Sequence, residues 1–217
     1  MHDATSPNRA RYAPRRRIVV GISGASGAIY GVRALAMLRA ANVESHLVAS
    51  RSAQITLADE LGMTLADVRA LADVHYPNAD IGAAIASGSF RTDGMIVAPC
   101  SIKTLSEIAT GVTSSLLSRA ADVMLKERRR LVLMVRETPL HAGHIRSLGA
   151  VTDAGAIVYP PVPAFYAKPA SLEQMVDQTL GRVLDLFDVD TDAVRRWQGL
   201  ADSFARGVPA GDGSGVR

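Results

Sequence analysis

Cysteine, aromatic residues and long apolar runs are all scarce in this sequence. One of its 217 residues is cysteine, Cys100, so a disulfide framework or a cysteine-rich zinc site within the chain is excluded. Aromatic residues make up 5%, too few for a nucleic-acid surface built from stacked rings. No apolar run reaches about 18 residues, so no membrane span is expected. The single cysteine favours a reducing, cytoplasmic location.

Positive charge is concentrated at the amino terminus. The formal net charge is +3, but residues 1–17 hold five arginines and one aspartate, which leaves the rest of the chain nearly neutral. Nucleic-acid binding is therefore not expected, because it needs a basic face on the fold. Arg15-Arg16-Arg17 before an apolar stretch resembles a twin-arginine signal. That stretch, residues 18–32, holds four glycines and two serines, and no small-residue cleavage site follows it, so export is not expected.

The sequence predicts one domain with two unstructured ends. We expect a disordered basic arm over residues 1–16, a single domain over 17–205 and a flexible glycine-rich tail over 206–217. The domain is expected to be a flavodoxin-like or Rossmann-like three-layer α/β sandwich, with one doubly wound parallel sheet covered by helices on both faces.

Alternating strand and helix patterns are the basis of that fold prediction. Short β-branched runs indicate buried strands, and amphipathic segments between them indicate helices. Strands are expected over 17–22, 44–48, 94–98, 131–135 and 156–159, with loops around a short helix over 75–91. Helices are expected over 28–40, 52–61, 64–71, 101–110, 114–128, 141–154, 171–187 and 191–205.

A glycine-rich segment follows the first expected strand. Residues 21–27 read GISGASG, and a helix is expected from Ala28. Glycines let backbone N–H groups approach an anion, and the positive end of the helix would face it. The spacing is GxxGxxG, unlike the dinucleotide-binding fingerprint, and no lysine follows as in a P-loop. The segment indicates either a phosphate or flavin turn or a tight strand-to-helix turn without a ligand.

Polar residues stand after three other expected strands, at the positions where parallel sheets bind ligands. Ser50 follows the second strand, Ser101-Ile102-Lys103-Thr104 follows the strand over 94–98, and Arg136-Glu137 follows the strand over 131–135. Each serine is also a good helix cap, so capping alone explains each one singly. Together, hydroxyl-bearing strand ends favour a site that binds a polar, phosphorylated ligand.

Two further features have plain structural explanations. Arg119, Asp122 and Lys126 share one helix face, which also suits a salt-bridged surface helix. Cys100 follows Pro99 at the end of an expected buried strand, where a lone cysteine is more often part of the core than a nucleophile.

Six segments together resemble the UbiX/Pad1-type flavin prenyltransferase family. They are GISGASGAIYG (21–31), ASGS (86–89), APCSIKTL (98–105), RAADVMLKERR (119–129), LVLMVRETPL (131–140) and PAFYAKP (163–169). These segments occur in the family's order across residues 17–187. Thr113-Ser114-Ser115 is a departure, because many relatives carry an Asp-Asn pair there.

The resemblance implies a metal-independent enzyme. Its activity would be transfer of a dimethylallyl group from dimethylallyl phosphate to N5 and C6 of reduced FMN. The product, prenylated FMN, would serve a UbiD-type decarboxylase. Family members are usually homododecamers with active sites between subunits.

The resemblance also implies roles for individual residues. Glu137, Ser26 and Lys126 would be catalytic, with Glu137 as acid and base. Residues that would contact FMN are Gly24, Ala25, Ser26, Ser50, Ser101, Ile102, Lys103, Thr104 and Arg136. Residues that would bind the dimethylallyl phosphate are Tyr166, Arg182, Lys126, Ser87, Gly88 and Ser89.

Two alternatives share the expected fold and cofactor. A flavin-dependent cysteine decarboxylase typically has PASANT after the central strand and an early active-site histidine. This chain has APCSIKT at residues 98–104, and His46 and His75 stand in unmatched contexts. A non-enzymatic FMN carrier or assembly subunit of a decarboxylase complex would keep the FMN residues but would not need Lys126 or Glu137.

Overall fold

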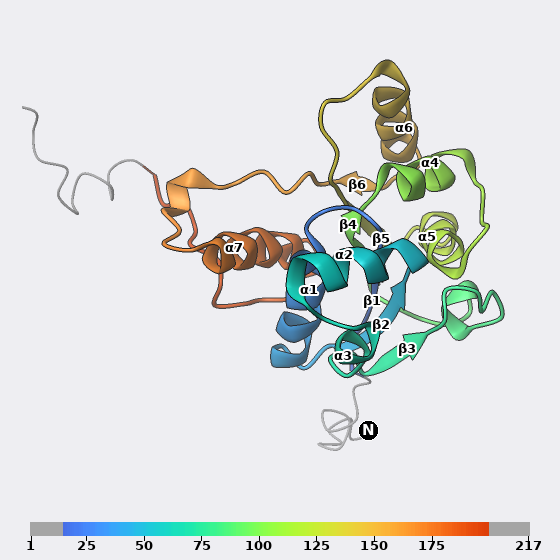
Figure 1. The fold of residues 1–217 in the computed structure, drawn as a ribbon, viewed down its shortest axis with the longest axis horizontal. Coiled ribbons are helices and arrows are strands. Elements are labelled where there is room, and N and C mark those ends of the chain that lie inside the picture. The colour runs from blue at the N-terminus through green and yellow to red at the C-terminus, as the bar shows by residue number, and fades with distance from the viewer. Residues whose placement is uncertain (1–14, 200–217) are drawn as a thin grey trace, which may run out of the picture.

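A six-stranded parallel sheet forms the centre of residues 15–199, the part of the chain that the computed structural model describes (Figure 1). The strand order is β3-β2-β1-β4-β5-β6, and every pairing is parallel. The strands are β1 (Arg17–Ile22), β2 (Glu44–Ala49), β3 (Val74–Tyr76), β4 (Gly94–Cys100), β5 (Arg130–Val135) and β6 (Ile157–Val158).

Helices cover both faces of this sheet, which confirms the predicted doubly wound α/β sandwich. One face packs against α1 (Ala28–Ala40), α2 (Arg51–Leu61), α3 (Leu65–Arg69) and α7 (Leu172–Asp185). The other face packs against α4 (Ile102–Thr110), α5 (Leu116–Lys126), α6 (Ala142–Asp153) and the short 3-10 turn η2 (Ala84–Ala86). A second 3-10 turn, η3 (Phe165–Ala167), precedes α7.

The two cores separate along β1 because successive side chains of a strand point to opposite faces. Ile18, Val20 and Ile22 join the core beneath α1 and α7, whereas Val19 joins the core beneath α4 and α5. All seven residues of β4 are buried, as expected for a central parallel strand covered on both sides. This arrangement leaves the ends of the strands as the places where side chains can meet a ligand.

Two segments differ from the sequence prediction. Residues 75–91 were expected to contain no strand, but β3 pairs with β2 at the sheet edge; its three residues are too few to produce a periodic pattern. Residues 191–199 form no helix, and the rest of the predicted 191–205 helix lies outside the described residues. The Gln178 side chain bonds both the N–H and the C=O of Arg195, which replaces the backbone pairing a helix would supply.

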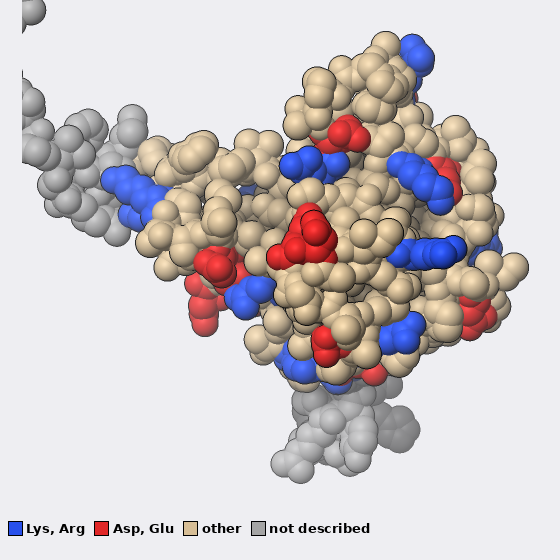
Figure 2. All heavy atoms as spheres, in the orientation of Figure 1, with Lys and Arg blue, Asp and Glu red and all other residues tan. Residues whose placement is uncertain are grey.

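The basic arm is described only at its end. Arg15 pairs with Asp73 at 3.2 Å, and Arg16 pairs with Asp93 at 3.0 Å, so both residues contact the domain. Residues 1–14 of the predicted arm and the whole tail over 206–217 lie outside the described residues. Figure 2 shows acidic and basic side chains interspersed over one face of the molecule. Within residues 15–199, no helix combines the length and hydropathy needed to cross a membrane.

Candidate active site

The predicted flavin-binding residues lie at one edge of the sheet, which we call the carboxyl edge because the strands end there. Gly24–Ser26 follow β1, Ser50 follows β2, Ser101–Thr104 follow β4, and Arg136 follows β5. β1 pairs with β2 on one side and with β4 on the other, so the chain changes direction across the sheet beside β1. Ligands of doubly wound sheets bind at such a switch point.

A buried serine that the sequence analysis missed joins two of these strand ends. The Ser23 hydroxyl donates to the Pro99 carbonyl oxygen at 2.9 Å and accepts the Ser101 backbone N–H at 2.7 Å. The Ser23 side chain is fully buried. It therefore fixes the turn after β1 against the turn after β4.

Two glycines are required by the shape of the turn after β1. A Cβ on Gly24 would lie 2.3 Å from the Ser52 Oγ, so the turn packs directly against the start of α2. Gly27 has φ of 99°, a left-handed conformation that glycine adopts without strain. The Ser50 side chain caps α2 and lies 3.1 Å from the Ser52 hydroxyl. The turn and the α2 start thus form one polar surface.

The amino end of α1 already binds a carboxylate, Glu60 from the last turn of α2. Its Oε2 accepts the N–H groups of Gly27 and Ala28, each at 2.9 Å. Partial burial would by itself raise the pKa of Glu60, but hydrogen bonds from Ala28 and Ser26 outweigh it and lower that pKa. The Arg136 guanidinium lowers it further. Glu60 therefore occupies the position at which the glycine pattern suggested an anionic ligand.

The amino end of α4 remains suited to a phosphate. The Ser101 hydroxyl caps the helix by accepting the Thr104 N–H at 3.3 Å, and it donates to the Thr104 hydroxyl at 3.2 Å. The N–H groups of Ile102 and Lys103 have no partner within the helix. The Lys103 side chain is exposed and pairs with Glu107 at 3.2 Å. Helix N–H groups and hydroxyls of this kind bind phosphate oxygens, so this end fits the phosphate of FMN.

Arg136 and Glu137 follow β5 at the same edge. The Arg136 N–H donates to the Cys100 carbonyl oxygen at 3.1 Å, which extends the pairing of β5 with β4. Both side chains are exposed, and the Glu137 carboxylate accepts the Thr138 N–H at 3.0 Å. Cys100 itself is fully buried, and burial raises the pKa of its thiol to about 12. That thiol stays protonated at neutral pH, as expected of a core cysteine.

Tyr166 lies in η3, and Arg182 lies on α7, the helix that packs against the sheet beside α1. Arg182 pairs with Asp185 at 2.5 Å, and the Tyr166 ring meets the Trp197 ring edge-on at 6.0 Å. Tyr159 lies just beyond β6, and burial raises its pKa. The Arg182 charge lowers the pKa of Tyr159, and Tyr166 raises it. The two predicted donor-binding residues thus both act on Tyr159, and both are partly exposed.

Lys126 and Ser87–Ser89 lie together, but at the opposite edge of the sheet, the amino edge. Lys126 ends α5 just before β5 begins. The segment with Ser87–Ser89 is held nearby, because the Arg129 guanidinium donates to the carbonyl oxygens of Gly88 and Phe90. A Cβ on Gly88 would lie 2.7 Å from the Lys126 Nζ. A strand of six residues rises about 3.3 Å per residue, so roughly 20 Å separates this group from Arg136. One chain therefore does not bring all predicted site residues together.

Known proteins are similar to this chain in sequence and in fold. The model of the Flavoprotein family matches residues 6–189. Flavin prenyltransferase UbiX of Neisseria meningitidis serogroup B is 54% identical over 187 residues, which cover 86% of this chain and 99% of that protein.

Two solved structures are similar over most of the chain. A crystal structure of AnUbiX in complex with FMN and dimethylallyl pyrophosphate has 55% sequence identity and a TM-score of 0.84, covering 85% of this chain and 98% of that one. A dodecameric FMN-dependent UbiX-like decarboxylase from Escherichia coli O157:H7 has 48% identity and a TM-score of 0.82, covering 84% and 100%.

Proposed function

The chain belongs to the UbiX-type flavin prenyltransferases of the Flavoprotein family, and from that premise we propose how its residues divide the transfer of a dimethylallyl group to FMN. Bound reduced FMN supplies the nucleophilic N5 and C6 positions to which the prenyl carbons become attached. The protein binds and orients the reactants, excludes water and stabilises the departing anion.

One observation carries this assignment: the residues after β1, β2, β4 and β5 converge on the carboxyl edge beside the switch point. There Gly24, Ala25 and Ser26 would hold the flavin ring, with Ser26 near N5. Ser101 and the start of α4 would hold the phosphate. Arg136 would add a cation to the same cradle.

Cleavage of the donor's C–O bond releases phosphate, and fixed cations would neutralise it. Lys126 and Arg182 carry permanent positive charge near neutral pH, and the Tyr166 hydroxyl donates a hydrogen bond. Preorganised donors in a water-poor site stabilise a developing anion without a metal ion. Replacing Lys126 by methionine should raise the barrier by about 3 kcal/mol, which corresponds to a rate loss on the order of a hundredfold.

Glu137 is the proposed acid and base. Its carboxyl group would protonate the departing phosphate and later take up the proton released at C6, directly or through water. Its exposure at the carboxyl edge and its place beside Arg136 support this role. Glu60, hydrogen-bonded to the turn that carries Ser26, is a second carboxylate beside the proposed flavin site.

The separation of Lys126 from the carboxyl edge supports an active site assembled from more than one subunit. A second copy of the chain would supply Lys126 and Ser87–Ser89 to the carboxyl edge of the first. The solved E. coli O157:H7 relative is dodecameric, which supports a homo-oligomer of that size for this chain. We also propose a UbiD-type decarboxylase as recipient of the product and a cytoplasmic location.

The alternative of a non-enzymatic FMN carrier predicts no need for donor-binding cations. Mass spectrometry of the flavin after anaerobic incubation with reduced FMN and dimethylallyl phosphate separates the two functions. An enzyme adds the mass of one five-carbon prenyl unit, whereas a carrier returns unchanged FMN. A parallel incubation with dimethylallyl pyrophosphate, the compound in the AnUbiX crystal, tests which donor is used.

A further inference from the structure

A second pocket opens beside the carboxyl edge and contains none of the residues assigned to the flavin or the prenyl donor. It has a volume of about 460 Å³, within the usual range of small-ligand sites. Its lining residues come from the end of β2, the starts of α2 and α5, α3, and β3 with the loop that follows it. Figure 1 labels these elements. We call this cavity the β3 pocket. Its lining residues are Leu47, Ala49, Arg51, Gln54, Leu65, Arg69, His75, Tyr76, Pro77, Asn78, Ala79, Ser114 and Ser115.

The β3 pocket has basic side chains and no acidic ones. Arg51, Arg69 and His75 line it, and no lining residue is Asp or Glu. Within residues 15–199, none of these three side chains has a described hydrogen bond or ion pair. Two guanidinium groups with unused donors therefore face one cavity.

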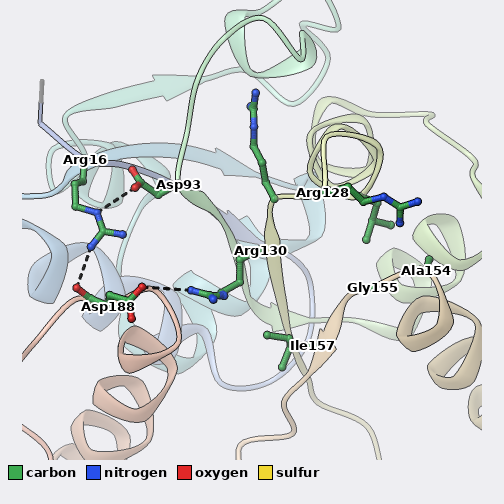
Figure 3. Close-up of a pocket in the computed structure, with 10 residues that line it drawn as sticks. Arg16, Asp93, Arg128, Arg130, Ala154, Gly155, Ile157 and Asp188 are labelled. Carbon is green, nitrogen blue, oxygen red and sulfur yellow. Dashed lines mark hydrogen bonds and ion pairs between the residues drawn. The ribbon is translucent and has the colours of Figure 1, made fainter.

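A larger pocket at the amino edge shows the opposite arrangement (Figure 3). Arg16 and Arg130 flank Asp188 there, and Arg16 also pairs with Asp93 at 3.0 Å. Arg129 in the same pocket is held by two backbone carbonyl oxygens. Three of its four arginines are held by the fold, Arg128 has no described side-chain partner, and the carboxylates of Asp93 and Asp188 oppose an anionic ligand. The β3 pocket has no lining carboxylate to oppose an anion.

The other residues that line the β3 pocket indicate what kind of ligand fits it. The Gln54 amide stands at the cavity, whereas the Ser114 and Ser115 hydroxyls already bond Glu107 and Ser118. The first residue of α2 adds the positive end of that helix. Leu47, Ala49, Leu65 and the Tyr76 ring supply apolar surface. Such a lining suits a compact molecule with an anionic head and an apolar body.

We infer that the β3 pocket binds a phosphate monoester through Arg51, Arg69 and His75, at a site separate from those of FMN and the prenyl donor. Guanidinium groups match phosphate oxygens in pairs and are the preferred partners of this anion. The phosphate could be inorganic phosphate, released by the proposed reaction, or the head of an organic phosphate. The binding chemistry is the same for both and does not depend on the proposed function.

Calorimetric titration of the FMN-loaded, full-length Arg182→Gln protein tests the inference, because that background weakens the prenyl-donor site. Phenyl phosphate and inorganic phosphate are the two probes. Arg69→Gln is added as the test change, and Arg146→Gln, an exposed arginine on α6 away from the pockets, is the matched control. Loss of one charge-assisted contact should weaken binding on the order of tenfold in the Arg69 variant and leave the control unchanged.

The outcomes separate clearly. Tighter binding of phenyl phosphate than of inorganic phosphate indicates an organic ligand, and equal binding indicates the free anion; both support the site. His75→Gln gives a second variant on an exposed side chain, in case Arg69→Gln lowers the melting temperature. The inference is overturned if neither probe binds, or if both pocket variants bind the probes as tightly as the control.

Discussion

The Ser23 hydroxyl accepts the backbone N–H of Ser101 at 2.7 Å. This contact joins the turn after β1 to the start of α4, the two segments proposed to hold the flavin ring and its phosphate. Because Ser23 is fully buried, no water molecule can easily replace its hydroxyl. The shape of the proposed FMN site therefore depends on a residue that does not itself belong to the predicted binding set.

Ser23→Ala should weaken both folding and FMN binding. The substitution leaves the Ser101 N–H unpaired, at a cost of about 1–3 kcal/mol in the free energy of unfolding. Urea unfolding measures that cost, and fluorescence titration measures FMN affinity. Ser106→Ala, on α4 but without a described side-chain hydrogen bond, is the control. Unchanged FMN affinity in Ser23→Ala would show that the contact does not shape the site.

Glu137→Gln should retain FMN but lose most turnover. Glutamine keeps the size of the side chain and cannot donate a proton to the departing phosphate. FMN affinity and the single-turnover rate of prenylation are measured on the same preparation. A variant that turns over at the wild-type rate removes Glu137 from the mechanism.

Hybrid oligomers should recover activity lost in each parent. Ser26→Ala removes a residue at the carboxyl edge and should slow the prenylation step more than it weakens FMN binding. Lys126→Met removes the cation at the amino edge. If the site combines the two edges from different subunits, random mixing of the variants restores roughly a quarter of the sites.

The hybrid experiment requires that the mixed variants be unfolded and reassembled together. Separately reassembled parents, mixed afterwards without exchange, are the control. Activity of the hybrid no higher than that of the parents would mean that Ser26 and Lys126 act within one chain or not in one site.

His46 should make the stability of the fold depend on pH. Its ring is buried. Because the Glu44 carboxylate can only accept, the His46 Nε2–H donates to Glu44 at 2.9 Å. The other ring nitrogen, Nδ1, then accepts from the Tyr76 hydroxyl at 2.9 Å. Desolvation lowers the pKa of His46 below 6.5, although Glu44 opposes the shift. The unfolded chain then binds more protons than the folded chain, so stability falls as the pH drops through about 6.5.

Melting temperatures of the wild type and His46→Gln measure this dependence. They are recorded between about pH 5 and 8, the range in which histidine titrates. The variant should show a flatter slope below about pH 6.5, whatever its absolute stability. Ser106→Ala, which removes no ionisable group, should keep the wild-type slope. Equal slopes in all three proteins would mean that His46 does not set the pH dependence.

The parts of the fold that the sequence predicted are those with local signals. Ser50 and Ser101 were named as candidate helix caps from residue type and position, and each caps its helix. The strand ends followed from short β-branched runs. The α7 helix was predicted from the helical spacing of its apolar residues.

The parts that the sequence did not predict depend on contacts between distant residues. Glu60 reaches the turn that holds Gly27, and Ser23 reaches Ser101, through tertiary packing that no local pattern encodes. The segment around Arg195 is irregular because the Gln178 side chain bonds its backbone. The position of Lys126 at the opposite edge of the sheet follows from its place just before β5, which the order of elements along the chain already indicated.

Fixed cations, in place of a divalent ion, neutralise the departing phosphate in the proposed reaction. The single-turnover rate of FMN prenylation, measured in enzyme treated with EDTA and again after addition of Mg²⁺, tests this most directly. The rate should be the same under both conditions, and Lys126→Met should remain slow in each. A rate that collapses with EDTA and returns with Mg²⁺ would contradict the proposal.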